Sequence, residues 1–206
     1  MDMNFPQYLY RGDRDGAGSR RLRPTLHFGQ LQTNLINGGI GREITEIPLT
    51  ELINRHVGFG WDKTHFLSFS ACERTAFRFG MRCDVAHLDD EIDRCIPSEG
   101  DHDWEFVIIV IDTKRIRLRR LENGVYEGLY RPHLAKFAAL DNYRIILIDV
   151  VRVLEGTSAY LDSLENAKRD EEWLILPATP VPFDNAVEYS AILDGNCISE
   201  VKRYKR

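Results

Sequence analysis

Three separated segments of the chain carry side chains whose types suit them to chemistry. The segments are Leu9–Asp13, Phe66–Ser70 and Asp170–Leu174. In the first, the guanidinium of Arg11 offers forked hydrogen-bond donors that fit a phosphate group. In the third, the carboxylates of Asp170 and Glu172 are suited to stabilising a developing positive charge or accepting a proton. Each segment alone could be a surface salt bridge, a helix cap or a charged strand entry, so only their combination indicates a site.

In this order the three segments resemble the arginine, serine-x-serine and glutamate motifs of mono-ADP-ribosyltransferases of the cholera-toxin-like branch. Tyr10 and Arg11 match the aromatic-arginine pair of the first motif, and Ala76 follows Ser70 by six residues, as in the family. Phe69 replaces the threonine that usually stands between the two serines. The resemblance implies an enzyme that cleaves its co-substrate NAD⁺ at the nicotinamide–ribose bond and transfers the ADP-ribose, without a metal.

The resemblance also implies roles for individual residues. Ser68 would orient the catalytic carboxylate of Glu172, and a shift of one residue would give the catalytic role to Glu171. Asp170, placed on the same strand face as Glu172, would assist with the acceptor. His56, ranked as secondary, resembles a histidine that precedes the serine motif in the family. The residues expected to bind NAD⁺ are Tyr10, Arg11, Gly12, His56, Ser68 and Ser70.

The sequence leaves several classes of molecule as alternatives for the acceptor of the ADP-ribose. A protein side chain is favoured over nucleic acid, although the basic runs 114–120 and 202–206 could track a phosphate backbone. By resemblance, the loop 155–169, which contains Tyr160, would contact the acceptor. With water as acceptor, the same pocket would belong to an NAD⁺ glycohydrolase. A non-enzymatic β-rich binding module is the remaining alternative.

Residue patterning predicts the elements that must position these side chains. The expected strands are 8–10, 64–69, 104–112, 143–154 and 173–176, with a closing hairpin of 186–193 and 197–204. The expected helices are 48–56, 71–79 and 133–140. For the helix 71–79 we expect Ser70 as the cap, Glu73 reaching back to it, and Gly80 as the stop.

The fold class that follows is α+β, with more strand than helix. The resemblance implies two packed, mainly antiparallel sheets around an NAD⁺ cleft, with flanking helices. A length of 206 residues, 43% of them hydrophobic, fits one domain over 1–206. The acidic segment 84–103, which contains Pro97 and Gly100, is predicted to be a surface excursion with a weak helical piece and is the strongest candidate for disorder.

Composition sets bounds on compartment and partners. A net charge of -5 argues against a surface devoted to nucleic acid, and no apolar run is long enough to predict a membrane span. The first residues lack the pattern of a secretory signal, and the four cysteines form no CxxC pair, so we expect free thiols, no metal site and action in a reducing cytoplasm. By family habit, such a chain would be a toxin or effector, delivered to another cell or held by an immunity protein or antitoxin.

Overall fold

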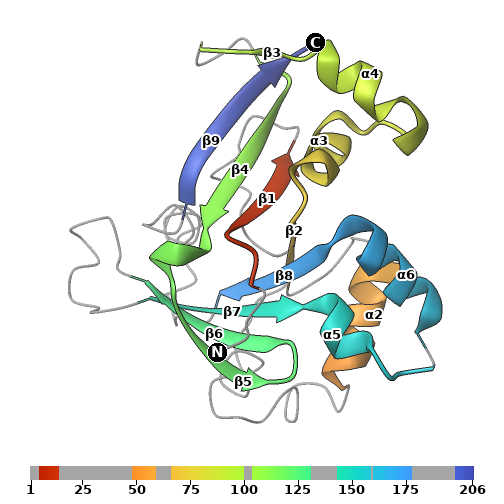
Figure 1. Ribbon diagram of the computed structural model, residues 1–206, viewed down its shortest axis with the longest axis vertical. Coiled ribbons are helices and arrows are strands. Elements are labelled where there is room, and N and C mark those ends of the chain that lie inside the picture. Colours follow the sequence, from red (N-terminus) through yellow and green to blue (C-terminus); the bar gives the residue numbers. More distant parts are fainter. Residues whose placement is uncertain are drawn as a thin grey trace, which may run out of the picture.

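The computed structural model describes residues 5–13, 48–58, 66–99, 104–130, 143–158, 160–177 and 198–206. These residues form an α+β fold built on one large antiparallel sheet with the strand order β3-β9-β4-β1-β2-β8-β7-β6-β5 (Figure 1). The strands are β1 (Tyr8–Asp13), β2 (Leu67–Ser70), β3 (Ile96–Pro97), β4 (Phe106–Asp112), β5 (Arg117–Glu122), β6 (Val125–Tyr130), β7 (Tyr143–Asp149), β8 (Glu172–Pro177) and β9 (Ile198–Lys205).

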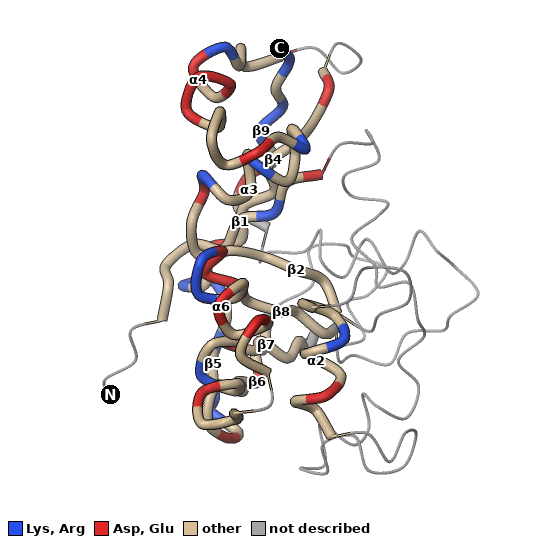
Figure 2. Tube along the Cα trace, turned by 90° about the vertical axis from the view of Figure 1, so that its right-hand side faces the viewer, with Lys and Arg blue, Asp and Glu red and all other residues tan. Residues whose placement is uncertain are grey.

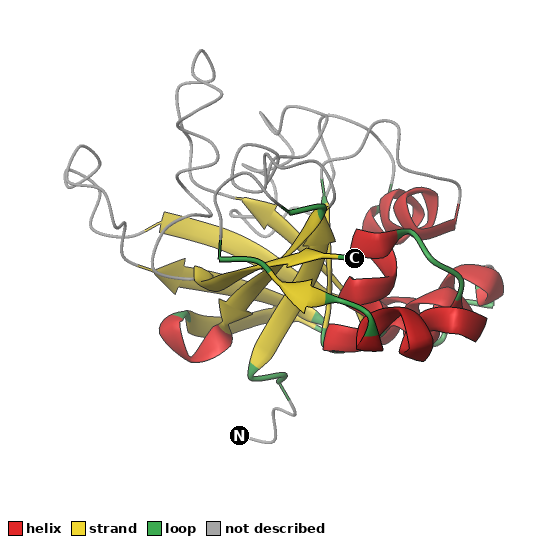
Figure 3. Ribbon diagram, turned by 90° about the horizontal axis from the view of Figure 1, so that it is seen from above, coloured by secondary structure: helices red, strands yellow, loops and turns green. Residues whose placement is uncertain are grey.

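The α-helices of the described residues gather at one side of the sheet (Figure 3). They are α2 (Leu49–Gly58), α3 (Glu73–Met81), α4 (Leu88–Asp93), α5 (Val150–Leu154) and α6 (Leu161–Asp170), accompanied by the short turns η2 (Val85–His87) and η3 (Thr113–Arg115). The expected α+β class is therefore confirmed.

The sheet consists of two halves that meet at a narrow seam. β1 pairs with β4 along its whole length, from Tyr8↔Asp112 to Asp13↔Val107, but it pairs with β2 only at Tyr10↔Ser70. In Figure 1 the strands β9, β4 and β1 run steeply, whereas β8, β7, β6 and β5 lie across the lower part of the molecule. The expectation of two packed sheets is thus not confirmed, because the single pair at the seam joins the described strands into one sheet.

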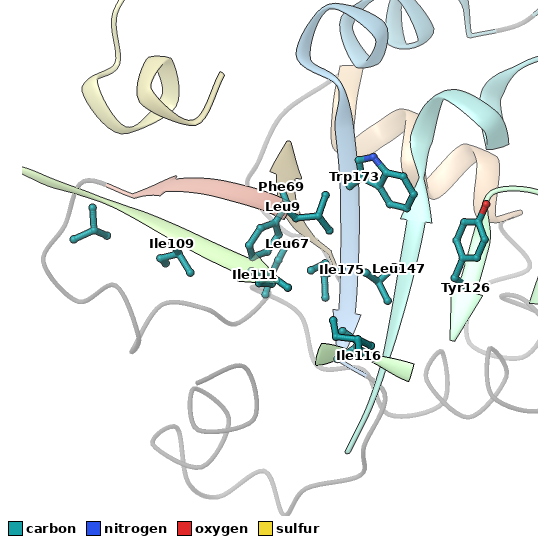
Figure 4. Packing of buried hydrophobic residues seen from close by; sticks show 12 residues of the cluster. Leu9, Leu67, Phe69, Ile109, Ile111, Ile116, Tyr126, Leu147, Trp173 and Ile175 are labelled. Carbon is teal, nitrogen blue, oxygen red and sulfur yellow. The ribbon is translucent and has the colours of Figure 1, made fainter. Parts of the chain in front are cut away.

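Two strands, β4 in one half of the sheet and β7 in the other, are buried on both faces, which explains their continuous apolar runs. In β4, Val107, Ile109 and Ile111 join a cluster with Leu9, Leu67, Phe69 and Trp173 (Figure 4), while Phe106, Ile108 and Val110 pack with Ala76 and Phe77 of α3. In β7, Ile146 and Ile148 pack with Leu174 of β8 and Ile53 of α2. These contacts hold the helices on the sheet face that also carries Leu174.

Several predicted elements are confirmed within the described residues. The helix 48–56 corresponds to α2, and the strands 104–112 and 173–176 correspond to β4 and β8. The predicted strand 197–204 corresponds to β9 (Ile198–Lys205), which pairs with β4 and β3. The predicted helix 133–140 and the first hairpin strand 186–193 lie outside the described residues. Within 84–99, the helical piece is present as η2 and α4, and β3 adds a short pairing to β9 that was not expected.

The helix after the serine motif begins and ends differently from the prediction. Its N-cap is Cys72 rather than Ser70, and Glu73 pairs with Lys202 of β9 at 2.7 Å instead of reaching back. Gly80 lies inside α3, where a Cβ atom would come 2.7 Å from the Phe106 ring. Close packing against β4, rather than a helix stop, therefore accounts for this glycine.

Three other predicted boundaries differ from the structure, and at the first of them a local hydrogen bond ends the strand. The strand 143–154 ends at Asp149, whose carboxylate accepts a hydrogen bond from the Arg152 amide at 3.1 Å and caps α5. The expected loop 155–169 is largely the helix α6. At the N-terminal side, β1 continues through Arg11 to Asp13, where the prediction had placed a loop.

Candidate active site

A cavity of about 440 Å³ opens at the seam of the sheet. Its walls come from β1, β2, α3 and the junction between α6 and β8. The predicted site residues that line it are Tyr10, Arg11, Gly12, Ser68, Ser70, Asp170 and Glu172. The fold therefore brings together residues from all three segments singled out in the sequence.

Glu172 and Ser68 are joined by a hydrogen bond within this cavity. The register pairs Ser68↔Leu174 and Ser70↔Glu172 put the two serines and Glu172 on one face of the neighbouring strands. The Ser68 Oγ donates to Oε1 of Glu172 at 2.9 Å. Glu171 does not line the cavity and is exposed, so the carboxylate that meets Ser68 is that of Glu172.

His56 completes a chain of hydrogen bonds behind this pair. Its Nε2 lies 2.7 Å from the Ser68 Oγ, and the side chain is buried. Burial, and then the charge of Arg11, lowers the pKa of His56 to about 4, so the ring is neutral near pH 7. A neutral ring protonated at Nε2 can donate to Ser68, which leaves the serine hydroxyl proton for Glu172. The histidine ranked as secondary in the sequence thus lies directly behind the serine.

The Glu172 carboxylate has an unusual acidity. Burial raises its pKa to about 7 from the ordinary value of 4.5, against the lowering effect of the Ser68 hydrogen bond. The charge of Asp170 adds to the rise, and those of Arg169 and Arg78 oppose it. A carboxyl group poised near neutral pH in a cavity is a feature of catalytic sites.

Arg11 holds the two halves of the sheet together beside this pair. Its Nη1 donates to the Ser68 carbonyl at 2.9 Å, and its Nη2 lies 3.9 Å from a carboxylate oxygen of Asp13. Burial lowers the pKa of Arg11, and Asp13 opposes that effect. The buried Nε has no hydrogen-bond partner among the described residues. Leaving a buried donor unpaired is costly, which is typical of sites kept for function rather than stability.

Gly12 is required by the close approach of β1 to α3. A Cβ atom at this position would come 1.9 Å from the Ala76 carbonyl oxygen and 2.5 Å from the Gly80 nitrogen. Both neighbours are backbone atoms, which cannot turn away as a side chain could. Gly12 therefore sets the distance between two walls of the cavity.

Asp170 does not share a strand face with Glu172, contrary to the prediction. It is the last residue of α6, and Glu171 follows in the left-handed conformation with φ of 46° before β8 begins. The Asp170 carboxylate is buried between Arg78 at 2.7 Å and Arg169 at 3.0 Å. Burial raises its pKa, but the hydrogen bonds from Arg169 and Arg78 outweigh this effect and the pKa lies below its ordinary value. Asp170 is therefore an ion-paired carboxylate.

Ser70 ties the end of β2 to the same junction. Its Oγ donates to the Asp170 carbonyl at 2.6 Å and accepts from the Cys72 amide at 2.9 Å. The Ala71 amide donates to the Glu171 carbonyl at 3.0 Å. These bonds support the turn that delivers Glu172 to the cavity.

The sequence interpretation missed two residues of α3 and its C-cap. Phe79 is 38% exposed and lines the cavity, as does Arg82, which caps α3 in the left-handed conformation with φ of 54°. Among the described lining residues, Arg82 and Arg11 are the cations, and Arg11 is already engaged with Ser68 and Asp13. A basic residue at a helix end is usually attributed to the helix dipole, so no signal in the sequence marked Arg82.

Tyr160, expected in an acceptor-contacting loop, is instead the N-cap residue of α6. Its hydroxyl donates to Oε2 of Glu51 in α2 at 3.0 Å. The aromatic side chain therefore links two helices in this structure.

Comparisons with protein families, curated proteins and solved structures found no match to this chain. Among the described residues, no group of histidine, cysteine and acidic side chains has an arrangement that could hold a metal ion. Three of the four cysteines are described and are free thiols. Across the described ranges, no helix has the length and apolar character needed to cross a membrane.

Proposed function

We propose that this chain is a mono-ADP-ribosyltransferase that cleaves NAD⁺ at the nicotinamide–ribose bond. The observation that carries the proposal is the hydrogen bond between Ser68 and Glu172 in a cavity that Arg11 also lines. The three residues come from different strands, and each has the side chain that the reaction needs.

The chemistry requires a negative charge beneath the ribose. When the bond between C1′ and the nicotinamide nitrogen breaks, its electron pair leaves with neutral nicotinamide, and positive charge develops on the ribose ring. An ionised Glu172 stabilises that charge, as carboxylates do in glycosidases. The acceptor nucleophile then bonds to C1′ and loses its proton, so the transferred ADP-ribose keeps both of its phosphates.

The acidity of Glu172 suits a cationic substrate. In the free protein, a pKa of about 7 means that the carboxyl group is about half protonated at neutral pH. The nicotinamide ring of NAD⁺ carries a positive charge, which favours the ionised carboxylate on binding. The cost of burying Glu172 is thus offset when the substrate is present.

Two arginines support binding of the pyrophosphate. Arg82 lines the cavity, is exposed and makes no described ion pair, so its guanidinium is available for a phosphate oxygen. Arg11 supports the strand below and contributes positive charge from within the wall. We assign Arg82 the more direct contact because Arg11 is already hydrogen-bonded.

A protein is the favoured acceptor. The basic runs that favoured nucleic acid are partly neutralised, since Arg119 pairs with Glu127 at 2.7 Å and Lys202 with Glu73 at the same distance. Figure 2 shows acidic residues interspersed with these basic strands. We further propose a toxin or effector role for the chain, so that its expression should arrest growth and Glu172→Ala should relieve the arrest.

The test is a comparison of wild type with Glu172→Ala and Glu171→Ala, using NAD⁺ labelled on nicotinamide and on the adenylate. Each protein is incubated alone and with cell lysate. We expect wild type and Glu171→Ala to release nicotinamide, and Glu172→Ala to lose about 10² to 10³ in rate. Glu171 is the matched control because it is the adjacent carboxylate and lies outside the cavity.

The location of the adenylate label separates the outcomes. Protease-sensitive label supports a protein acceptor, and nuclease-sensitive label assigns nucleic acid instead. Nicotinamide release with no label on a macromolecule would identify an NAD⁺ glycohydrolase. If wild type releases no nicotinamide under any condition, the enzymatic proposal is wrong.

A further inference from the structure

A largely buried ion pair between Arg78 and Asp170 joins α3 to α6. Arg78 Nη2 lies 2.7 Å from Asp170 Oδ1, with 13% and 9% of the two side chains exposed. On its other side, Asp170 receives two bonds of 3.0 Å from Arg169, which is mostly exposed. Removing Asp170 leaves the largely buried guanidinium of Arg78 without this carboxylate, whereas removing Arg78 leaves Asp170 paired with Arg169 alone.

Arg78 also contacts the residues that form the α3 wall of the cavity. Its guanidinium carbon lies 4.6 Å from the centre of the Phe79 ring, within the range of a cation–π contact. Its carbonyl accepts hydrogen bonds from the amides of Arg82 and Cys83 at the end of the helix. One residue thus connects Asp170 with both Phe79 and Arg82.

The ion pair spans the seam of the sheet. α3 packs on β1 and β4, whereas Asp170 leads into β8 in the other half. Figure 1 shows α3 beside the steep strands and α6 beside the lower ones. Because β1 and β2 share only the pair Tyr10↔Ser70, additional contacts are needed to fix the two halves.

We propose that Arg78 is a positioning residue: through its ion pair with Asp170 it fixes the Glu172 carboxylate relative to the α3 wall of the cavity. The inference rests on the proposed function of Glu172. Asp170 accordingly serves as the partner of Arg78 and not as a base for the acceptor.

The charges around Glu172 make this role measurable. Asp170 and Arg169 face it from α6 and Arg78 from α3, while Ser68 of β2 donates to it and connects it to the neutral His56 of α2. Arg11 and Asp13 stand on β1 in the same cavity wall. Removing the charge of Arg78 should therefore raise the pKa of Glu172, and removing that of Asp170 should lower it.

The experiment uses the full chain with the substitutions Arg78→Met, Arg78→Lys and Asp170→Asn. The control is Arg74→Met, one turn earlier on α3, where Arg74 makes an exposed pair with Asp89. Two readouts are taken: the pH dependence of NAD⁺ turnover, and the titration of the ¹³C-labelled Glu172 carboxyl by NMR, assigned with Glu172→Gln. The NMR titration does not depend on catalysis.

We expect Arg78→Met to lower kcat at least tenfold and to raise the Glu172 pKa by about half a unit or more. Asp170→Asn should lower that pKa by a similar amount, and Arg78→Lys, which keeps the charge, should keep the wild-type pKa. Arg74→Met should match wild type in both readouts. If Arg78→Met does not fold, Asp170→Asn decides the matter, because it breaks the same ion pair. Positioning then predicts a lower kcat above pH 8 in spite of the lower Glu172 pKa, whereas an effect of charge alone predicts no loss of kcat there, and Arg78→Lys should keep the wild-type kcat.

Unchanged titration of Glu172 in Asp170→Asn and Arg78→Met, or equal losses of kcat in Arg78→Met and Arg74→Met, would overturn the inference. A wild-type protein that turns over no NAD⁺ would instead contradict the proposed function. In that case the NMR titration still tests whether the charges of Arg78 and Asp170 act on Glu172 as the structure predicts.

Discussion

The Ser68 Oγ lies 2.9 Å from Oε1 of Glu172, although 104 residues separate the two along the chain. The distance follows from the pairing of β2 with β8, and His56 reaches the same hydroxyl from α2. The Ser68 hydroxyl, which His56 orients, therefore donates to a carboxyl group whose pKa is raised by burial.

The first prediction concerns the pH dependence of NAD⁺ cleavage. The proposed role of Glu172 requires its ionised form, so kcat/KM should fall roughly tenfold per pH unit below the pKa of about 7. Ser68→Ala removes a hydrogen bond that lowers this pKa, so the acid limb should move to higher pH. Steady-state rates from pH 5 to 9 check this, with Glu171→Gln as the control that keeps the wild-type limb. An acid limb at the same pH in Ser68→Ala would contradict the assignment.

The second prediction concerns stability. The pKa of Glu172 is about 7 in the folded protein and 4.5 ordinarily, so the folded state binds the proton more tightly. The stability that this group contributes is fully present below about 4.5 and is lost as pH rises through 7. Glu172→Gln should therefore stabilise the protein by roughly 1 to 3 kcal/mol at pH 8 and by much less at pH 4.5. The range lies below the full value of the pKa difference because the cavity is open to solvent on one side. Urea unfolding at the two pH values measures the difference, and an equal gain at both would refute it.

The third prediction concerns the contact proposed between Arg82 and the pyrophosphate of NAD⁺. Arg82→Ala should raise KM for NAD⁺ by about ten- to a hundredfold with a smaller change in kcat, because the lost contact is present in both ground and transition states. Calorimetry should show a similar loss of affinity for ADP-ribose. Nicotinamide riboside, which lacks the pyrophosphate, should bind equally to both proteins. Arg74→Ala serves as the control on the same helix. Equal affinity of Arg82→Ala and wild type for ADP-ribose would exclude the contact.

The fourth prediction concerns the packing of β1 on α3. Gly12→Ala places a methyl group 1.9 Å from the Ala76 carbonyl oxygen, so α3 must move or the chain must unfold. We expect a loss of stability of about 1 to 3 kcal/mol together with weaker NAD⁺ binding. Gly156→Ala tests the alternative that any glycine change destabilises: with φ of 88° it carries backbone strain but meets no atom within 4 Å, so it should spare binding. A Gly12→Ala protein with wild-type stability would contradict the close approach.

Sequence patterns by themselves determined the α+β class and much of the element order. Buried strands need continuous apolar runs, as in β4 and β7, and a helix packed on one face needs apolar residues at helical spacing, as in α2. Both patterns can be seen in the sequence alone. The three motif segments could also be recognised, because side-chain type is visible without coordinates. His56, too, was named from the sequence, though not its contact with Ser68.

Only the tertiary structure decided how these residues meet. The left-handed conformation of Glu171, which moves Asp170 off the strand, has no signature in a residue other than glycine or asparagine. The partners of Asp170 and the placement of Arg82 depend on α3 packing beside a segment distant in sequence. The raised pKa of Glu172 likewise depends on burial, which is a property of the assembled cavity and not of the residue or its neighbours in the chain.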